Sequence, residues 1–138
     1  MSSQIHSFED LDVWEESMRL ARQIYSLLQD SKNYALRDQI QRSAISIPSN
    51  IAEGFERNYS KDYIRFLYTA KGSAGELRTQ LYLANEIGMI EKNIGRELIE
   101  NSRKISSMLY KLIESLQRKR DEATAKFVPR SPFSVFIG

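Results

Sequence analysis

Apolar residues recur along this chain at alternating steps of three and four, the spacing of one face of an α-helix. The pattern predicts four helices, at residues 11–28, from about residue 36 to Gly54, from a cap at Ser60 to Gly88, and from about residue 91 to Lys119. No stretch before the last residues alternates as a strand would. The short connections favour antiparallel neighbours, so the prediction is an all-α, up-and-down four-helix bundle.

The first predicted helix carries two neighbouring apolar rows. One is Leu11, Trp14, Met18, Ala21, Tyr25 and Leu28; the other is Val13, Leu20, Ile24 and Leu27. Together they span roughly 200° of the helix, more than one bundle core requires. Two interpretations stay open: the helix is deeply buried in its own domain, or the second row meets another subunit.

Proline and glycine residues lie inside the second and third predicted helices, where they affect the expected bends, ends and contacts. Pro48 lies inside the second, where we expect a kink or short break, and Gly54 either ends that helix or is followed by Phe55 on the same face. Gly72 and Gly75 lie inside the third, where we expect another helix to approach closely. The second apolar rows of the first and third helices predict subunit contacts at Val13, Leu20, Ile24, Leu27, Ile64, Tyr68, Gly75 and Tyr82.

The apolar periodicity stops after Arg120, and Pro129 and Pro132 exclude a continuing helix around them. Residues 1–120 are therefore expected to form the bundle and residues 121–138 a C-terminal tail. That tail is apolar, which favours docking on the bundle or on a neighbouring subunit over partial disorder.

The amino-acid composition limits the cellular compartment in which the protein is expected and the covalent links it can form. The chain has no cysteine, which excludes disulfides and favours a reducing cytoplasm. It shows neither a secretory signal nor an apolar run long enough to span a membrane, so a cytoplasmic protein without a membrane partner is expected.

Basic residues concentrate in the fourth helix, although the net charge is only +2. They are Lys92, Arg96, Arg103, Lys104, Lys111, Arg118, Lys119 and Arg120. Most project onto one strip opposite the apolar face, which could follow the phosphates of RNA or DNA. Glu100 and Glu114 lie in the same strip, so an ordinary solvated, ion-paired face is an equal alternative.

Catalytic motifs are missing from the sequence. His6 is the only histidine, and there is no nucleophile elbow or phosphate-binding loop. No enzyme activity, metal or cofactor is therefore expected. Glu53 and Glu76 lie among small or apolar residues, and we expect them to be partly buried in a structural polar network of Arg42, Asn50, Glu53, Arg57 and Glu76.

Two segments resemble a known family. Residues 43–54 (SAISIPSNIAEG) and 66–77 (FLYTAKGSAGEL), with the opening Leu11-Asp12-Val13-Trp14 and residues 108–113, are similar to the 23S ribosomal RNA intervening-sequence proteins, bacterial four-helix bundles. The resemblance covers roughly residues 8–118. It implies a ring-shaped homo-oligomer, a pentamer by similarity to the accessory variability protein of diversity-generating retroelements, which associates with a reverse transcriptase and nucleic acid. The family supplies no catalytic residues, and the apolar tail lies outside its pattern.

Two functions therefore compete. The first is a homo-oligomeric scaffold that binds RNA or DNA through the basic helix. The second is a structural or protein-interaction module that binds another polypeptide and no nucleic acid.

Overall fold

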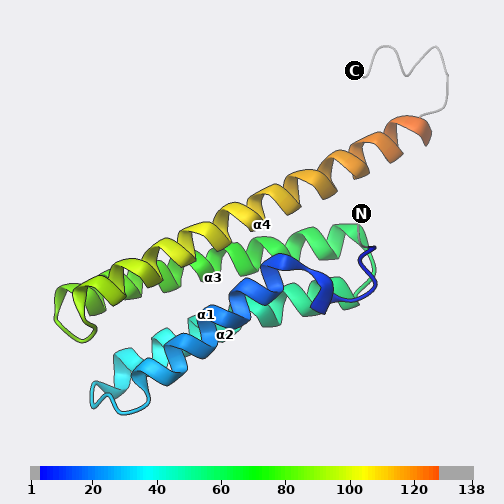
Figure 1. Ribbon diagram of the computed structural model, residues 1–138. Coiled ribbons are helices and arrows are strands. Elements are labelled where there is room, and N and C mark those ends of the chain that lie inside the picture. Colours follow the sequence, from blue (N-terminus) through cyan, green and yellow to red (C-terminus); the bar gives the residue numbers. More distant parts are fainter. Residues whose placement is uncertain (1–3, 128–138) are drawn as a thin grey trace.

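The computed structural model describes residues 4–127, and in that part of the chain every regular element is a helix. A short 3-10 helix, η1 (Phe8–Asp10), precedes α1 (Asp12–Leu28), α2 (Tyr34–Glu56), α3 (Ser60–Glu86) and α4 (Lys92–Phe127) (Figure 1). No helix among these residues is long and apolar enough to cross a membrane.

The four long helices form an up-and-down bundle. Each packs on its neighbour in the chain, and α4 closes the bundle against α1, whereas the diagonal pairs α1–α3 and α2–α4 make no extensive contact. Figure 1 shows α3 and α4 side by side along one layer and α1 with α2 along the other. The predicted all-α four-helix fold is confirmed.

Three members of the row that was a candidate for subunit contacts lie in the core, beside Ala21 and Leu28 of the other row, whereas Leu27 is 38% exposed. Val13, Leu20 and Ile24 are 4%, 2% and 0% exposed, and Ile64 of α3 is 7% exposed. These four side chains are enclosed by their own chain, so they cannot form a subunit interface. Deep burial therefore explains the width of the apolar arc on α1.

The predicted break at Pro48 is wrong, because α2 runs continuously from Tyr34 to Glu56. An interior proline costs about 3 kcal/mol relative to alanine. Ile47 and Ile51 on either side are fully buried, and burying one such side chain stabilises by roughly 1.5–3 kcal/mol. Packing therefore offsets the lost backbone hydrogen bond.

The helix also passes through Gly54, and the chain reverses at Asn58, whose φ is 51°.

Gly54 sets how closely α2 approaches α3. A Cβ atom at this position would lie 2.7 Å from the Cβ of Phe66 and 3.3 Å from the backbone oxygen of Tyr63. Beside it, the rings of Phe55 and Tyr63 meet edge to face with centroids 5.8 Å apart, and burial raises the pKa of Tyr63 to about 12. Only glycine fits between the two helices here.

Gly72 and Gly75 do not mark a close helix approach within this chain. Nothing lies within 4 Å of where a Cβ would stand at either position. The expected approach is therefore wrong for the single chain, and both glycines leave the surface of α3 open.

The helix ends differ from the predicted ones in two places. Ser60 is the first residue of α3 rather than its cap, which is Tyr59. At the other end Gly88 takes a φ of 76°, as a helix-terminating glycine does. The α4 helix begins after Glu91, whose Oε2 accepts from the backbone N–H of Ile94 at 2.9 Å. This bond and one from Asn93 lower the pKa of Glu91.

The predicted end of the fourth helix at Lys119 is also wrong, since α4 continues to Phe127. Residues 121–126 are exposed, so no apolar periodicity signals their helix, but most are residues that favour helix and no proline occurs before Pro129. The boundary expected at residue 120 falls inside this helix, whose end extends beyond the other helices in Figure 1. The predicted docking of residues 128–138 lies outside the described residues.

Replacing Gly54 with alanine should lower the free energy of unfolding by about 1–3 kcal/mol, because the new methyl group meets Phe66 across a packed seam. Gly72→Ala is the matched control: it gains the same helix propensity without a contact and should raise stability by about 0.5–1 kcal/mol. Denaturant midpoints of the two variants measure the difference. Equal midpoints would show that α2 and α3 can separate without cost.

Candidate nucleic-acid interface

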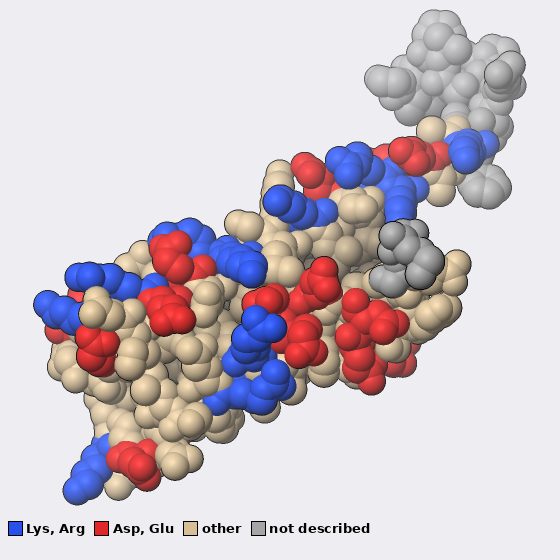
Figure 2. Space-filling model, viewed as in Figure 1, with Lys and Arg blue, Asp and Glu red and all other residues tan. Residues whose placement is uncertain are grey.

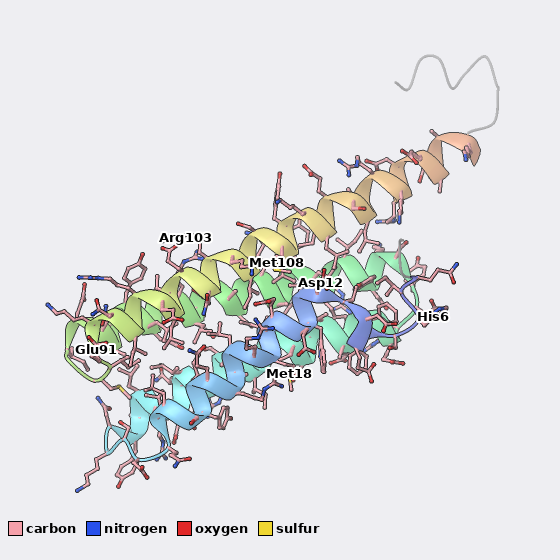
Figure 3. The ribbon with its side chains drawn as sticks, in the orientation of Figure 1. His6, Asp12, Met18, Glu91, Arg103 and Met108 are labelled. Atoms are coloured by element: carbon pink, nitrogen blue, oxygen red, sulfur yellow. The ribbon has the colours of Figure 1, made fainter. Side chains whose placement is uncertain are left out.

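The α4 basic surface consists of the eight cationic residues that the sequence predicts: Lys92, Arg96, Arg103, Lys104, Lys111, Arg118, Lys119 and Arg120. All are exposed except Arg120, which is partly buried. They reach solvent because α4 turns its apolar row, including Leu98, Ile105 and Leu109, into the core. Figure 3 shows Arg103 on the side of α4 away from α1.

Carboxylates neutralise part of this surface. Arg103 pairs with Glu100, Arg118 with Glu114 at 3.8 Å between Nη1 and Oε1, and Lys104 with Glu16 of α1 at 3.8 Å between Nζ and Oε2. Figure 2 shows basic and acidic groups interspersed along α4. Exposed pairs of this kind contribute only about 0–1 kcal/mol each, so a phosphate can replace the carboxylate.

The other five cations lack such a partner within residues 4–127. None has a carboxylate oxygen within ion-pair distance; these residues are Lys92, Arg96, Lys111, Lys119 and Arg120. The interpretation of α4 as an ordinary ion-paired face therefore accounts for three of these eight cations and leaves the larger share unexplained.

A groove between α3 and α4 adds two cations that single-helix projection could not find. Its volume is about 350 Å³, and it is lined by Lys71, Arg78, Arg103, Ser106, Ser107, Tyr110 and Lys111. Arg78 donates from Nη1 to the Oγ of Ser106 at 3.4 Å, which links the two walls. The lining holds four cationic side chains and no carboxylate. We call this hollow the α3–α4 groove.

Three tyrosines border the α3–α4 groove with exposed rings. Tyr68, Tyr110 and Tyr82 are 58%, 54% and 44% exposed. The hydroxyl of Tyr82 accepts from Nη2 of Arg103 at 3.0 Å. Tyr68 and Tyr110 line an adjoining hollow of about 220 Å³, together with Ile113, Glu114, Gln117, Arg118 and Asp121.

The predicted polar network is not one network. Glu53 and Arg57 form an exposed pair at 3.1 Å between Oε2 and Nη2, so the expected burial of Glu53 is wrong. Glu76 is also exposed; its Oε1 accepts from Ser43 at 3.0 Å. Arg42 lines the same hollow as Glu76 and makes no ion pair within the described residues.

Serine hydroxyls bridge α2 to α3, in one case through the Glu76 carboxylate. The hydroxyls of Ser46 and Ser73 lie 2.8 Å apart, and Asn50 donates from Nδ2 to the backbone oxygen of Ser46 at 2.8 Å. These serines could not be recognised from the sequence, because a short hydroxyl side chain gives little signal in an apolar pattern. The arrangement of these hydrogen bonds is typical of a structural contact between two packed helices.

Acidic and histidine side chains do not gather into a metal-binding group anywhere in residues 4–127. His6 is exposed, and its backbone N–H donates to Asp10. The pKa of Asp10 is lowered by that bond and by one from the backbone of Ser7. This arrangement caps the start of the chain and suggests no chemistry.

The model of the 23S rRNA-intervening sequence proteins matches residues 9–111, most of the chain. The chain belongs to this family. A crystal structure of a Bacteroides thetaiotaomicron protein of unknown function, from the S23 ribosomal protein family, superposes with a TM-score of 0.69 at 28% identity. The alignment covers 73% of this chain and 97% of that one. No curated protein matches the sequence.

Membership in the 23S rRNA-intervening sequence family accounts for the bundle and assigns no activity to it. The family match ends at residue 111, within α4. It therefore includes all residues that line the α3–α4 groove, whereas Arg118, Lys119 and Arg120 lie beyond it.

Proposed function

We propose that this member of the 23S rRNA-intervening sequence family is a non-catalytic, homo-oligomeric protein that binds the phosphate backbone of RNA or DNA through the α4 basic surface. One observation carries the proposal. Eight cations lie along a single helix, and five of them have no carboxylate partner within residues 4–127. Three of those five, Lys92, Arg96 and Lys111, project onto one strip with Arg103, Lys104 and Arg118, and such a cationic face suits a polyanion.

Binding of this kind draws its free energy from counterion release. Each phosphate neutralised by a lysine or arginine frees condensed cations, so affinity falls as salt rises, with a slope of about 0.7–0.9 per phosphate. Point charges on phosphates read no base sequence. The expected binding is steeply salt-dependent and weakly selective for sequence.

Self-association is the second part of the proposal. Of the predicted interface, Leu27, Tyr68, Gly75 and Tyr82 reach the surface. Leu27 is 38% exposed and Ile94 is 37% exposed, and both line a hollow between α1 and α4. The α1–α4 contact is the least extensive of the four seams, so this apolar strip is the favoured place for a second copy to add contacts. A closed ring would repeat the α4 basic surface and raise avidity.

A protein-interaction module is the alternative function. Leu83 and Ile87 are 48% and 54% exposed at the end of α3, and exposed apolar side chains at one end of a bundle suit a polypeptide partner. In that case α4 would be merely solvated. Absence of nucleic-acid binding by the intact oligomer at low salt would favour this alternative.

Reversing Arg96, Lys111 and Lys119 to glutamate should weaken binding to labelled RNA and DNA by at least about a hundredfold near 50 mM salt, because several phosphate contacts become repulsive. These three have no carboxylate partner in the described part of the chain, so the reversal breaks no ion pair there. The matched control reverses Lys32, Arg42 and Lys61, none of which lies on α4.

Fluorescence anisotropy across about 50–200 mM salt gives the affinities and the salt slope. The control variant has the same net charge, so its binding should fall far less. Equal loss in both variants would mean that net charge alone attracts nucleic acid, and the α4 assignment would fail.

Leu27→Asp should lower the particle mass toward that of a single chain, because a carboxylate would be desolvated at an apolar contact. Ile45→Asp is the control, since Ile45 is similarly exposed, at 48%, on α2. Light scattering after size-exclusion chromatography measures the mass of both. A wild-type protein that already runs as a single chain would contradict the proposed assembly.

A further inference from the structure

We infer that the nucleic acid is single-stranded, with a backbone phosphate seated in the α3–α4 groove and a base stacked on Tyr110. The inference rests on the proposed nucleic-acid binding and names its substrate class. It adds two residues of α3, Lys71 and Arg78, and an aromatic ring to a surface that otherwise offers only charge.

The groove has the chemistry of a phosphate site. Lys71 and Arg78 are partly buried, and the bond from Arg78 to Ser106 limits the movement of the guanidinium. Serine hydroxyls and a guanidinium fork are suitable donors to phosphate oxygens. One neighbouring carboxylate, Glu100, already pairs with Arg103. A phosphate in the groove would compete with that one carboxylate.

The adjoining hollow has different chemistry, which suits a base. It shares Tyr110 with the groove and contains Glu114 and Asp121, and its cation Arg118 already pairs with Glu114, so it suits a phosphate less than the groove does. Carboxylates accept hydrogen bonds from the exocyclic amino groups of bases. Tyr68 and Tyr110 both line this hollow and present exposed rings. The phosphate and the base of one nucleotide therefore have neighbouring sites of opposite character.

Single strands fit this arrangement and duplexes do not. In a duplex the faces of the bases are covered by their neighbours in the stack, so a tyrosine ring can stack only on an unpaired base. Proteins that bind single strands combine a cationic groove with aromatic platforms. Here Tyr68, Lys71, Arg78 and Tyr82 lie on one face of α3, with spacings of three, seven and four residues.

This inference moves Tyr68 and Tyr82 from the predicted subunit interface to the nucleic-acid surface. Tyr82 accepts a hydrogen bond from Arg103, and Tyr68 lies in a hollow rimmed by charged residues. A fully buried subunit contact would have to desolvate those charges. Leu27 and Ile94 remain available for self-association on the opposite seam of α4.

The test compares a single-stranded oligonucleotide of about ten nucleotides with its own duplex at the same salt, using fluorescence anisotropy. The wild-type protein should bind the single strand at least about tenfold more tightly. Tyr110→Ala should weaken single-strand binding about tenfold or more, because a base loses its stacking partner. Tyr110→Phe keeps the ring and should keep the affinity. Tyr34→Ala removes an equally exposed ring on α2 and should have no effect.

Lys71→Glu tests the phosphate half of the site. It should weaken single-strand binding and reduce the salt slope by about 0.7, the contribution of one phosphate contact. Lys32→Glu, with the same change of charge outside the groove, should leave the slope nearly unchanged.

Four results would overturn the inference. Equal affinity for single strand and duplex, or unchanged affinity in Tyr110→Ala, would reject stacking but leave the α4 basic surface standing. Loss of binding in Tyr110→Ala together with a fall in particle mass would assign Tyr110 to self-association. Failure of the wild-type protein to bind either nucleic acid at low salt would reject the proposed function itself.

Discussion

Close packing of α3 between α2 and α4 is the constraint on which the rest of the molecule depends. On the inner side of α3, Ala70, Ala74 and Ala84 are fully buried, and Gly54 of α2 fits beneath Phe66. Small side chains let neighbouring helices approach closely, and interiors tolerate no added methyl group without strain. The same packing fixes the rotation of α3 about its axis. The flank of α3 that carries Lys71 and Arg78 is thereby brought beside α4.

Helix number and helix type were predictable because both follow from apolar spacing, which the sequence displays directly. Both adjacent apolar rows of α1 supply core residues, and which of their members face inward was not predictable. On α1 the rows lie side by side, and the choice depends on where α2 and α4 sit. Trp14 and Met18, in the first row, are only partly buried, while Ile24 in the second is fully enclosed. Three of the eight predicted interface residues, Val13, Leu20 and Ile24, are enclosed by their own chain for this reason.

Pro48 led to the prediction of an interruption inside a helix that is continuous. The loss of apolar periodicity led to the prediction that the fourth helix ends earlier than it does. Pro48 predicted an interruption that buried isoleucines on either side override. Past Arg120 the apolar pattern fades, yet helix formers carry α4 to Phe127. Periodicity reports burial, whereas helix formation in an exposed segment depends on local propensity. The α4 basic surface could be predicted because it lies on one helix; the groove could not, because its lining comes from two.

The attraction of α4 for a polyanion depends on where its charges lie as well as on their sum. A net charge of +2 for the whole chain would attract a polyanion weakly if it were spread evenly. The positions of the charges alter that expectation, because Glu16, Glu100 and Glu114 each already form an ion pair with a cation of α4. Because such exposed pairs are weak, they leave the cations accessible while keeping the free protein from excessive self-repulsion. The groove differs from the rest of α4 in that its own lining contains no carboxylate. A phosphate bound there competes with the pair between Glu100 and Arg103, while Lys71, Arg78 and Lys111 of the lining are in no ion pair within residues 4–127.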